Sequence, residues 1–154
     1  MTSELDPALQ EIAACYAASA QAKGVEVELE AASAARVYGN SRRSTLIFGN
    51  LLDNSLHFTP AGGRIRIRSY RTGERVRVEV WDQGCGLPPA ELERVFQRFY
   101  QLTGNEGSGS SGLGLATVEA LVKQLGGEVR LENRVDRSRL VAIVTLPEAL
   151  PIAA

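Results

Sequence analysis

Gly49-Asn-Leu-Leu-Asp-Asn-Ser-Leu-His-Phe-Thr-Pro60 is the most informative segment of this 154-residue chain. It predicts the second half of a helix over 41–58, which ends before Pro60 because the residue preceding a proline disfavours helical geometry. Asn50 and Asn54 lie one turn apart inside that helix. Asparagine is a poor residue there, because its side chain competes for backbone hydrogen bonds. Two such residues on one face therefore indicate that their amide oxygens bind a ligand.

The helix over 41–58 has two different faces. With about 100° of rotation per residue, its apolar residues fall on one stripe and its polar residues on another. We expect the apolar stripe to pack on a core and the polar row to face a ligand. The apolar stripe contains Phe48, Leu51, Leu52 and Leu56, and the polar row contains Asn50, Asn54 and His57.

The elements before and after this helix follow from hydrophobic periodicity. Ser41 is the expected N-cap of the helix. Two strictly alternating segments after Gly63 predict strands, and Arg71-Thr-Gly-Glu74 links them as an antiparallel hairpin. The predicted helices are 4–22, 41–58, 89–95 and 113–125, and the predicted strands are 25–29, 36–38, 64–70, 75–81, 128–133 and 139–146.

These elements predict an α+β sandwich, in which about three helices cover one face of a mixed, mostly antiparallel sheet of about five strands. We expect a single domain over 1–154 with a core over about 5–147. Residues 101–111 are rich in Gly, Ser and Asn and are expected to be mobile. The tail, 147–154, is expected to be frayed.

Composition excludes several functional classes. Hydrophobic residues make up 44% and charged residues 23%, and the net charge of −1 gives no electrostatic argument for a nucleic-acid or membrane partner. Arginines between Arg64 and Arg71 alternate with apolar residues and are expected on the solvated face of a strand. No apolar run reaches the roughly 20 residues of a membrane span, and Met1–Gln10 lacks a secretion signal. Two cysteines without metal-ligand spacing leave a reducing, cytoplasmic setting as the default, and a single histidine offers little to a histidine-based triad or a zinc site.

Asp82-Gln-Gly-Cys-Gly86 follows the predicted strand 75–81. A carboxylate at a strand end, followed by two glycines, is a fixed acceptor beside backbone that a ligand can approach closely. Such an aspartate can accept a hydrogen bond from an exocyclic amine such as that of adenine, and it discriminates against guanine. Taken alone, the segment is also compatible with a tight turn.

Gly107-Ser-Gly-Ser-Ser-Gly-Leu-Gly114 leads directly into the predicted helix 113–125. It does not follow a strand, so it is not a dinucleotide fingerprint, and it lacks the Gly-Lys-Ser/Thr of a P-loop. A glycine-rich entry to a helix N-terminus can bind phosphates; the alternative is a flexible linker. Upstream, three aromatic residues in Val95–Gln101 could anchor a lid or pack in a core.

Together and in order, four motifs resemble the N box, first glycine box, F box and second glycine box of bacterial sensor histidine kinases. They are Asn50-x-x-x-Asn54, Asp82-x-Gly-x-Gly86, Phe96-x-Arg-Phe-Tyr100 and Gly112-Leu-Gly-Leu115. The resemblance covers roughly 5–147. The aromatic box favours histidine kinases over the gyrase, Hsp90 and MutL ATPases of the same clan.

The resemblance implies the Bergerat fold and an ATP site with Mg²⁺. Asn54 would coordinate Mg²⁺ through its amide oxygen, Asp82 would hold the adenine amine, and residues 97–111 would form the ATP lid. Asn50 and Arg98 would be catalytic. The remaining expected ATP-binding residues are His57, Phe58, Gly84, Gly86, Leu87, Phe96, Phe99, Tyr100, Gln101, Gly109, Ser111, Gly112, Leu113, Gly114 and Leu115.

Asn50 suggests which group receives the phosphate. Hydrolytic members of the clan and its anti-sigma serine kinases typically carry a glutamate base there, whereas asparagine cannot take a proton. Transfer to histidine needs no such base, because a neutral ring nitrogen already has a free lone pair. His57 and Gln101 stand where lysine and arginine are frequent, and Arg98 could compensate for the lost positive charge.

The expected partner is a dimerisation/phosphoacceptor domain. The family's acceptor histidine lies on a helical hairpin upstream, whereas the only histidine here is His57, inside the N box. We therefore expect transfer of the γ-phosphate to a histidine outside this chain, with a response regulator as an indirect partner and this domain alone as a monomer. The alternatives are a non-catalytic ATP-binding scaffold and a stand-alone anti-sigma-type serine kinase.

Overall fold

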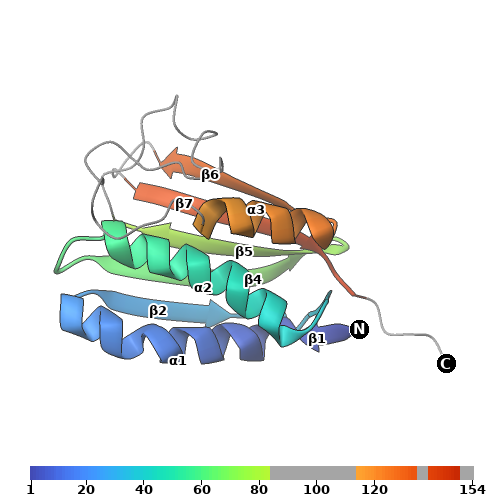
Figure 1. The fold of residues 1–154 in the computed structure, drawn as a ribbon, viewed down its shortest axis with the longest axis horizontal. Coiled ribbons are helices and arrows are strands. Elements are labelled where there is room, and N and C mark those ends of the chain that lie inside the picture. Colours follow the sequence, from blue (N-terminus) through green and yellow to red (C-terminus); the bar gives the residue numbers. More distant parts are fainter. Residues whose placement is uncertain (84–113, 135–138, 150–154) are drawn as a thin grey trace.

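The protein folds as a five-stranded sheet with helices on one face, together with a small two-stranded sheet (Figure 1). The structure, a computed structural model, describes residues 1–83, 114–134 and 139–149. Its elements are β1 (Thr2–Glu4), α1 (Leu5–Lys23), β2 (Glu26–Ala31), β3 (Arg36–Tyr38), α2 (Ser41–Phe58), β4 (Arg64–Thr72), β5 (Arg75–Asp82), α3 (Gly114–Gln124), β6 (Glu128–Arg134) and β7 (Arg139–Pro147).

The large sheet is mixed, as the sequence predicts. Its strand order is β2-β4-β5-β7-β6, with β2 parallel to β4 and every other pair antiparallel. Thr72 pairs with Arg75, so the β4–β5 hairpin turns through two residues. Gly73 has φ +68° at the first of them, a conformation that favours glycine. The predicted α+β class, with three helices and five strands in the main sheet, is confirmed.

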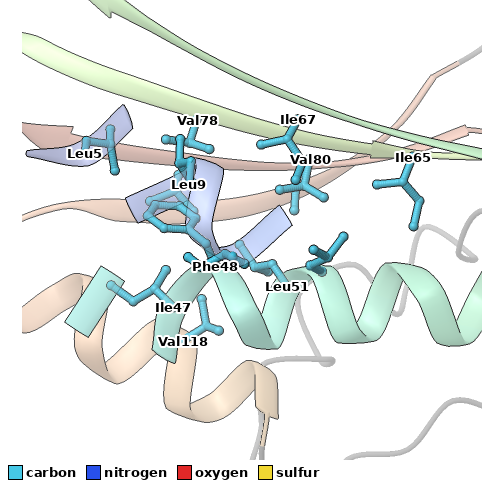
Figure 2. Close-up of a cluster of buried hydrophobic side chains, with 14 of the residues drawn as sticks. Leu5, Leu9, Ile47, Phe48, Leu51, Ile65, Ile67, Val78, Val80 and Val118 are labelled. Carbon is cyan, nitrogen blue, oxygen red and sulfur yellow. The ribbon is translucent and has the colours of Figure 1, made fainter. Parts of the chain in front are cut away.

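The core lies between the helices and the sheet (Figure 2). Alternate residues of β4 and β5 face the helices, because successive side chains of a strand point to opposite faces. The predicted apolar stripe of α2 packs against them, and all four of its residues are buried. The core residues drawn in Figure 2 include Leu5, Leu9, Ile47, Phe48, Leu51, Ile65, Ile67, Val78, Val80 and Val118.

Glycine follows the end of two helices. Gly24 follows α1 with φ +79°, and Gly126 follows the last turn after α3 with φ +80°. In each case the N–H groups of the glycine and of the next residue donate to carbonyls in the last turn. The N-cap prediction for α2 was wrong by one residue. Asn40 is extended and its Oδ1 accepts from the Arg43 N–H at 3.2 Å, whereas Ser41 is already helical.

Two further parts of the chain differ from the expectation. β1 was not predicted; it pairs antiparallel with β3 and gives the chain an ordered start. The tail is not frayed up to residue 149, because Glu148 bridges to Val37 and the Ala149 N–H donates to the Arg36 carbonyl at 2.8 Å. Pairings across such sequence distances leave no local pattern. The predicted helix 89–95 and segment 101–111 lie outside the described residues.

Candidate nucleotide site

The C-terminal half of α2, which carries the polar row, lies near the end of β5 and the start of α3 (Figure 1). α2 carries this row on the side away from its apolar stripe, as the spacing predicts. β5 ends at Asp82 and α3 begins at Gly114. The fold therefore gathers the first motif, the start of the second and the end of the fourth at one end of the molecule.

Asn50 has a defined orientation. Its Nδ2 donates to the Leu46 carbonyl one turn earlier, at 2.7 Å. A Cβ added at Gly114 would lie 3.5 Å from the Asn50 Oδ1. The amide donor is thus used within α2, and the carboxamide oxygen faces the first residue of α3. Asn50 presents an acceptor at a helix N-terminus, where backbone N–H groups and the helix dipole favour anions.

Asn54 lies one turn further along the same face. It is half-buried, and within the described ranges its side chain makes no hydrogen bond to another residue. The described residues also contain no cluster of three or more His, Cys, Asp or Glu side chains. A single carboxamide oxygen fits Mg²⁺, which keeps several waters and substrate phosphate oxygens in its octahedral shell. The donor set therefore suits a magnesium ion that arrives with a nucleotide.

His57 and Phe58 end the row. Their rings meet edge to face, with centroids 5.0 Å apart and an interplanar angle of 88°. His57 is exposed and Phe58 is half-buried. Lys23 holds the backbone beneath them, because its Nζ donates to the carbonyls of Leu56 and His57. A cation at a helix C-terminus stabilises the helix, so the end of α1 fixes the end of α2.

Asp82 is almost fully buried, with 4% of its surface exposed. It continues the row of β5 residues that faces the helices, after Val76, Val78 and Val80. The loop after α2 lies close to the same strand end. A Cβ added at Gly63 would come within 2.6 Å of the Thr59 Cγ2 and 3.8 Å of the Gln83 Oε1. Glycine is required there, since any side chain would push this loop away from Thr59.

α3 contributes Gly114 and Leu115. Gly114 starts the helix, and half-buried Leu115 packs against the core. The other predicted site residues lie outside the described residues, and their roles stay predictions. They are Gly84, Gly86, Leu87, Phe96, Arg98, Phe99, Tyr100, Gln101, Gly109, Ser111, Gly112 and Leu113, together with the predicted lid, 97–111.

Sequence reasoning missed two residues of α1 that support the site. One is Lys23, which reads in the sequence only as the end of a helix. The other is Tyr16, whose ring lies over α2 where Gly49 leaves room: a Cβ at Gly49 would be 3.8 Å from the Tyr16 hydroxyl. Burial, with smaller contributions from Asp53 and Cys15, raises the pKa of Tyr16. The one available signal was Gly49, an unfavourable residue for a helix interior.

The family comparison covers every motif of this site. The family described as "Histidine kinase-, DNA gyrase B-, and HSP90-like ATPase" matches residues 39–150, which is more than half of the chain. The chain belongs to this ATPase family. Its polar row, glycine boxes and aromatic box all fall inside the matched residues. This match confirms the wider ATPase family to which the four motifs belong.

Relatives of the ATPase family point to sensor kinases. The sensor protein CreC of Escherichia coli is 46% identical over 85 residues, which cover 55% of this chain and 18% of CreC. The signal transduction histidine-protein kinase/phosphatase MprB of a Mycobacterium species is 41% identical over 65% of this chain and 20% of that protein. The sensor-like histidine kinase SenX3 of Mycobacterium tuberculosis is 30% identical over 85% of this chain and 32% of SenX3. The chain thus spans a fifth to a third of these proteins.

Solved structures agree. The mycobacterial sensor histidine kinase MprB superposes with a TM-score of 0.83 at 25% identity, covering 98% of this chain and 99% of that one. The catalytic domain of the histidine kinase ThkA superposes with a TM-score of 0.86 at 25% identity, covering 96% of this chain and 95% of the ThkA chain. This ATPase-family chain therefore has the fold of a histidine kinase catalytic domain. Within the described ranges, no helix is long and apolar enough to cross a membrane.

Proposed function

We propose that this domain binds Mg-ATP and donates the γ-phosphate to a histidine on a dimerisation/phosphoacceptor domain outside the chain. The observation that supports this best is the contact between Asn50 and Gly114. It sets an acceptor oxygen against a helix N-terminus, with Asn54 one turn further along α2. The N-terminus of a helix can bind phosphates, and the Asn50 carboxamide oxygen can bind a metal ion or accept from an N–H donor.

We assign the parts of the nucleotide according to the order of the predicted site residues. Asp82 ends β5, which reaches the C-terminal half of α2, and its carboxylate would accept from the adenine amine. Phe58 would pack near the same group, Asn54 would bind Mg²⁺ and Asn50 would face the γ-phosphate. The residues proposed for the lid, with Arg98, would supply positive charge. The family resemblance supports these assignments residue by residue.

The proposed transfer needs no base on the protein. A neutral imidazole nitrogen of the acceptor attacks the γ-phosphorus with its lone pair, and the bond from phosphorus to the β–γ bridging oxygen breaks, releasing ADP. Asn50 cannot take a proton, and this reaction does not require it to, because the attacking nitrogen carries none. Bound Mg²⁺ would neutralise charge on the phosphate oxygens, so the protein chiefly positions the reactants.

The biological setting follows from the same proposal. The relatives are much longer proteins, and two of them are described as sensor proteins or sensor-like kinases. We infer that the domain acts in the cytoplasm as part of two-component signalling, with a response regulator as an indirect partner. We expect the isolated domain to be a monomer.

The first experiment measures nucleotide binding. Mg-ATP at about one hundred times its Kd should stabilise the domain by about 2.7 kcal/mol, a rise in Tm of about 5–10 °C. Asn54→Ala and Asp82→Ala should abolish the rise. Asp53→Ala is the matched control, because Asp53 is an exposed neighbour of Asn54 on α2. Absence of any rise with the wild-type domain would refute the ATP site.

The second experiment measures transfer. Labelled ATP and a dimerisation/phosphoacceptor hairpin added in trans should give acid-labile label on histidine. Acid-stable label on a serine partner would favour an anti-sigma-type kinase instead. A non-catalytic scaffold is favoured by one observation, the exposed His57 at a position where the family often has lysine. Binding of Mg-ATP without transfer to any hairpin would support the scaffold.

A further inference from the structure

A groove between α1 and α2 lies next to the proposed ATP site. Its volume is about 260 Å³. Each helix contributes four lining residues from two successive turns, two residues from each turn. The lining residues are Glu11, Ile12, Cys15 and Tyr16 from α1 and Thr45, Leu46, Gly49 and Asn50 from α2.

The surface of the groove is mostly apolar. Leu46 is 43% exposed, and among the described residues the other large exposed hydrophobics are Met1 and Tyr38, which lie on or beside the small sheet. The Thr45 hydroxyl donates to the Ser41 carbonyl at 3.0 Å, and the Asn50 amide donates to the Leu46 carbonyl. Both donors are thus used within α2. From α2 the groove therefore presents mainly the Leu46 side chain and the surface of Gly49, opposite Ile12 and Tyr16 of α1.

The direction of α2 decides what can lie there. In the proposed complex, Asp82 binds the adenine, Asn54 the Mg²⁺ and Asn50 the γ-phosphate. The nucleotide therefore runs from adenine to γ-phosphate toward the N-terminal end of α2. Leu46 lies one further turn in that direction, about 6 Å along the axis. An acceptor that attacks the γ-phosphate from the side opposite to ADP must therefore arrive at the Leu46 end. Asn50 lines both the ATP site and the groove, so the two surfaces are continuous.

We propose that the α1–α2 groove is the docking surface for the histidine-bearing helix of the phosphoacceptor domain. This inference rests on the proposed function. The partner helix would insert an apolar side chain beside Leu46 and place its histidine about one turn away, over Asn50. The apolar residue of the partner helix therefore lies three or four positions from the histidine in sequence. Glu11 is the one charged lining residue in the described part, which favours a basic residue on the same helix.

The test uses hairpins from several sensor histidine kinases, and keeps those that the wild-type domain labels on histidine. Leu46→Glu should raise the KM for the hairpin at least tenfold and leave kcat within about twofold. Leu46→Met should behave as wild type. Tyr38→Glu is the matched control, since Tyr38 is equally exposed, at 45%, but lies on β3. All three variants should keep the full Tm rise with Mg-ATP, which shows that they fold and bind nucleotide.

A double-mutant cycle sharpens the test. Glutamate at the apolar hairpin position three or four residues from the histidine should raise KM to a similar extent, and the two changes together should be less than additive. An unchanged KM for Leu46→Glu would overturn the groove proposal and leave the proposed function standing. Altered self-association of the domain with an unchanged KM would assign the groove to a second copy instead. Absence of label on every hairpin, with Mg-ATP still bound, would overturn transfer and docking together.

Discussion

The two faces of the five-stranded sheet carry opposite kinds of side chain. The face under the helices is apolar, and residues such as Ile67 on β4 are 3% exposed or less. On the other face, arginines of β4 pair with glutamates of β2, for example Arg68 with Glu30 at 2.9 Å and Arg66 with Glu30 at 3.5 Å. Apolar burial stabilises the fold, whereas exposed ion pairs contribute little. The covered face therefore holds the fold together, and the open face keeps the sheet solvated.

Each face also has one buried carboxylate on β5, and their surroundings differ. Glu79 on the open face accepts from the Tyr70 hydroxyl at 2.6 Å and from the Trp81 Nε1 at 2.9 Å, so both of its oxygens bond to this chain. Asp82 on the covered face is the last residue of β5, and this end of the strand lies near the C-terminal half of α2. Burial of a carboxylate alone does not mark a binding site. What distinguishes Asp82 is its position at a strand end, beside the other groups that we propose bind ATP.

Ile67→Ala should cause the largest loss of stability among these tests. Removing a buried isoleucine side chain typically costs about 2–5 kcal/mol, and Ile67 is nearly inaccessible. Equilibrium urea unfolding monitored by Trp81 fluorescence gives the value. A loss below about 1 kcal/mol would mean that the covered face does not dominate stability.

Tyr70→Phe tests the buried carboxylate of the open face. It removes a hydroxyl that donates to Glu79, and should cost about 1–1.5 kcal/mol at pH 8. Burial, and then the hydrogen bond to Glu79, raises the pKa of Tyr70 above its ordinary value of about 10. The folded state holds this proton longer than the unfolded state does. The stabilising contribution is therefore complete below pH 10 and is lost as the pH rises through the raised pKa.

The Tyr70→Phe variant should accordingly lose less stability than wild type between pH 9 and pH 11. Tyr38→Phe is the control, because Tyr38 is exposed and its hydroxyl makes no hydrogen bond within the described residues. Part of the alkaline loss should persist, since burial also raises the pKa of Tyr16. Identical alkaline slopes for Tyr70→Phe and wild type would contradict the assignment.

Lys23→Met tests the support of the site from α1. The change keeps the aliphatic stem and removes the charge at the end of α2, so stability should fall by about 0.5–1 kcal/mol. Because His57 and Phe58 then lose a fixed backbone, the Kd for Mg-ATP should rise severalfold, as measured by titration calorimetry. Lys123→Met is the matched control in the last turn of α3, where Lys123 pairs with Glu119 in solvent. Equal effects of the two changes on Kd would show that Lys23 does not support the site.

Arg66→Ala should have the smallest effect. The Arg66 and Glu30 side chains are 50% and 52% exposed, and pairs of this kind contribute less than about 1 kcal/mol. Urea unfolding should show a change within about 0.5 kcal/mol, and less in 1 M salt, where exposed charges are screened. A loss comparable to that of Ile67→Ala would reverse the difference between the two faces.

Much of the fold was predictable because it depends on local periodicity. Alternation in β4 and β5 predicted both strands and the face of each residue, and the spacing in α2 predicted its buried stripe. The parallel pairing of β2 with β4 and the small sheet of β1 and β3 were not predictable in this way. Partner choice depends on contacts between distant segments, which single-strand patterns do not encode.

The candidate site also combines features that local sequence defines with contacts that only the folded chain makes. Residue type and spacing alone define the two asparagines one turn apart, the carboxylate at a strand end and the glycine-rich entry to a helix, because these are properties of neighbouring residues. Only the folded chain brings the Asn50 oxygen to Gly114, places Lys23 under the end of α2 and seats Tyr16 over Gly49. Those contacts join helices that are far apart in sequence. Packing of three helices on one sheet produces them, and no local pattern records that packing.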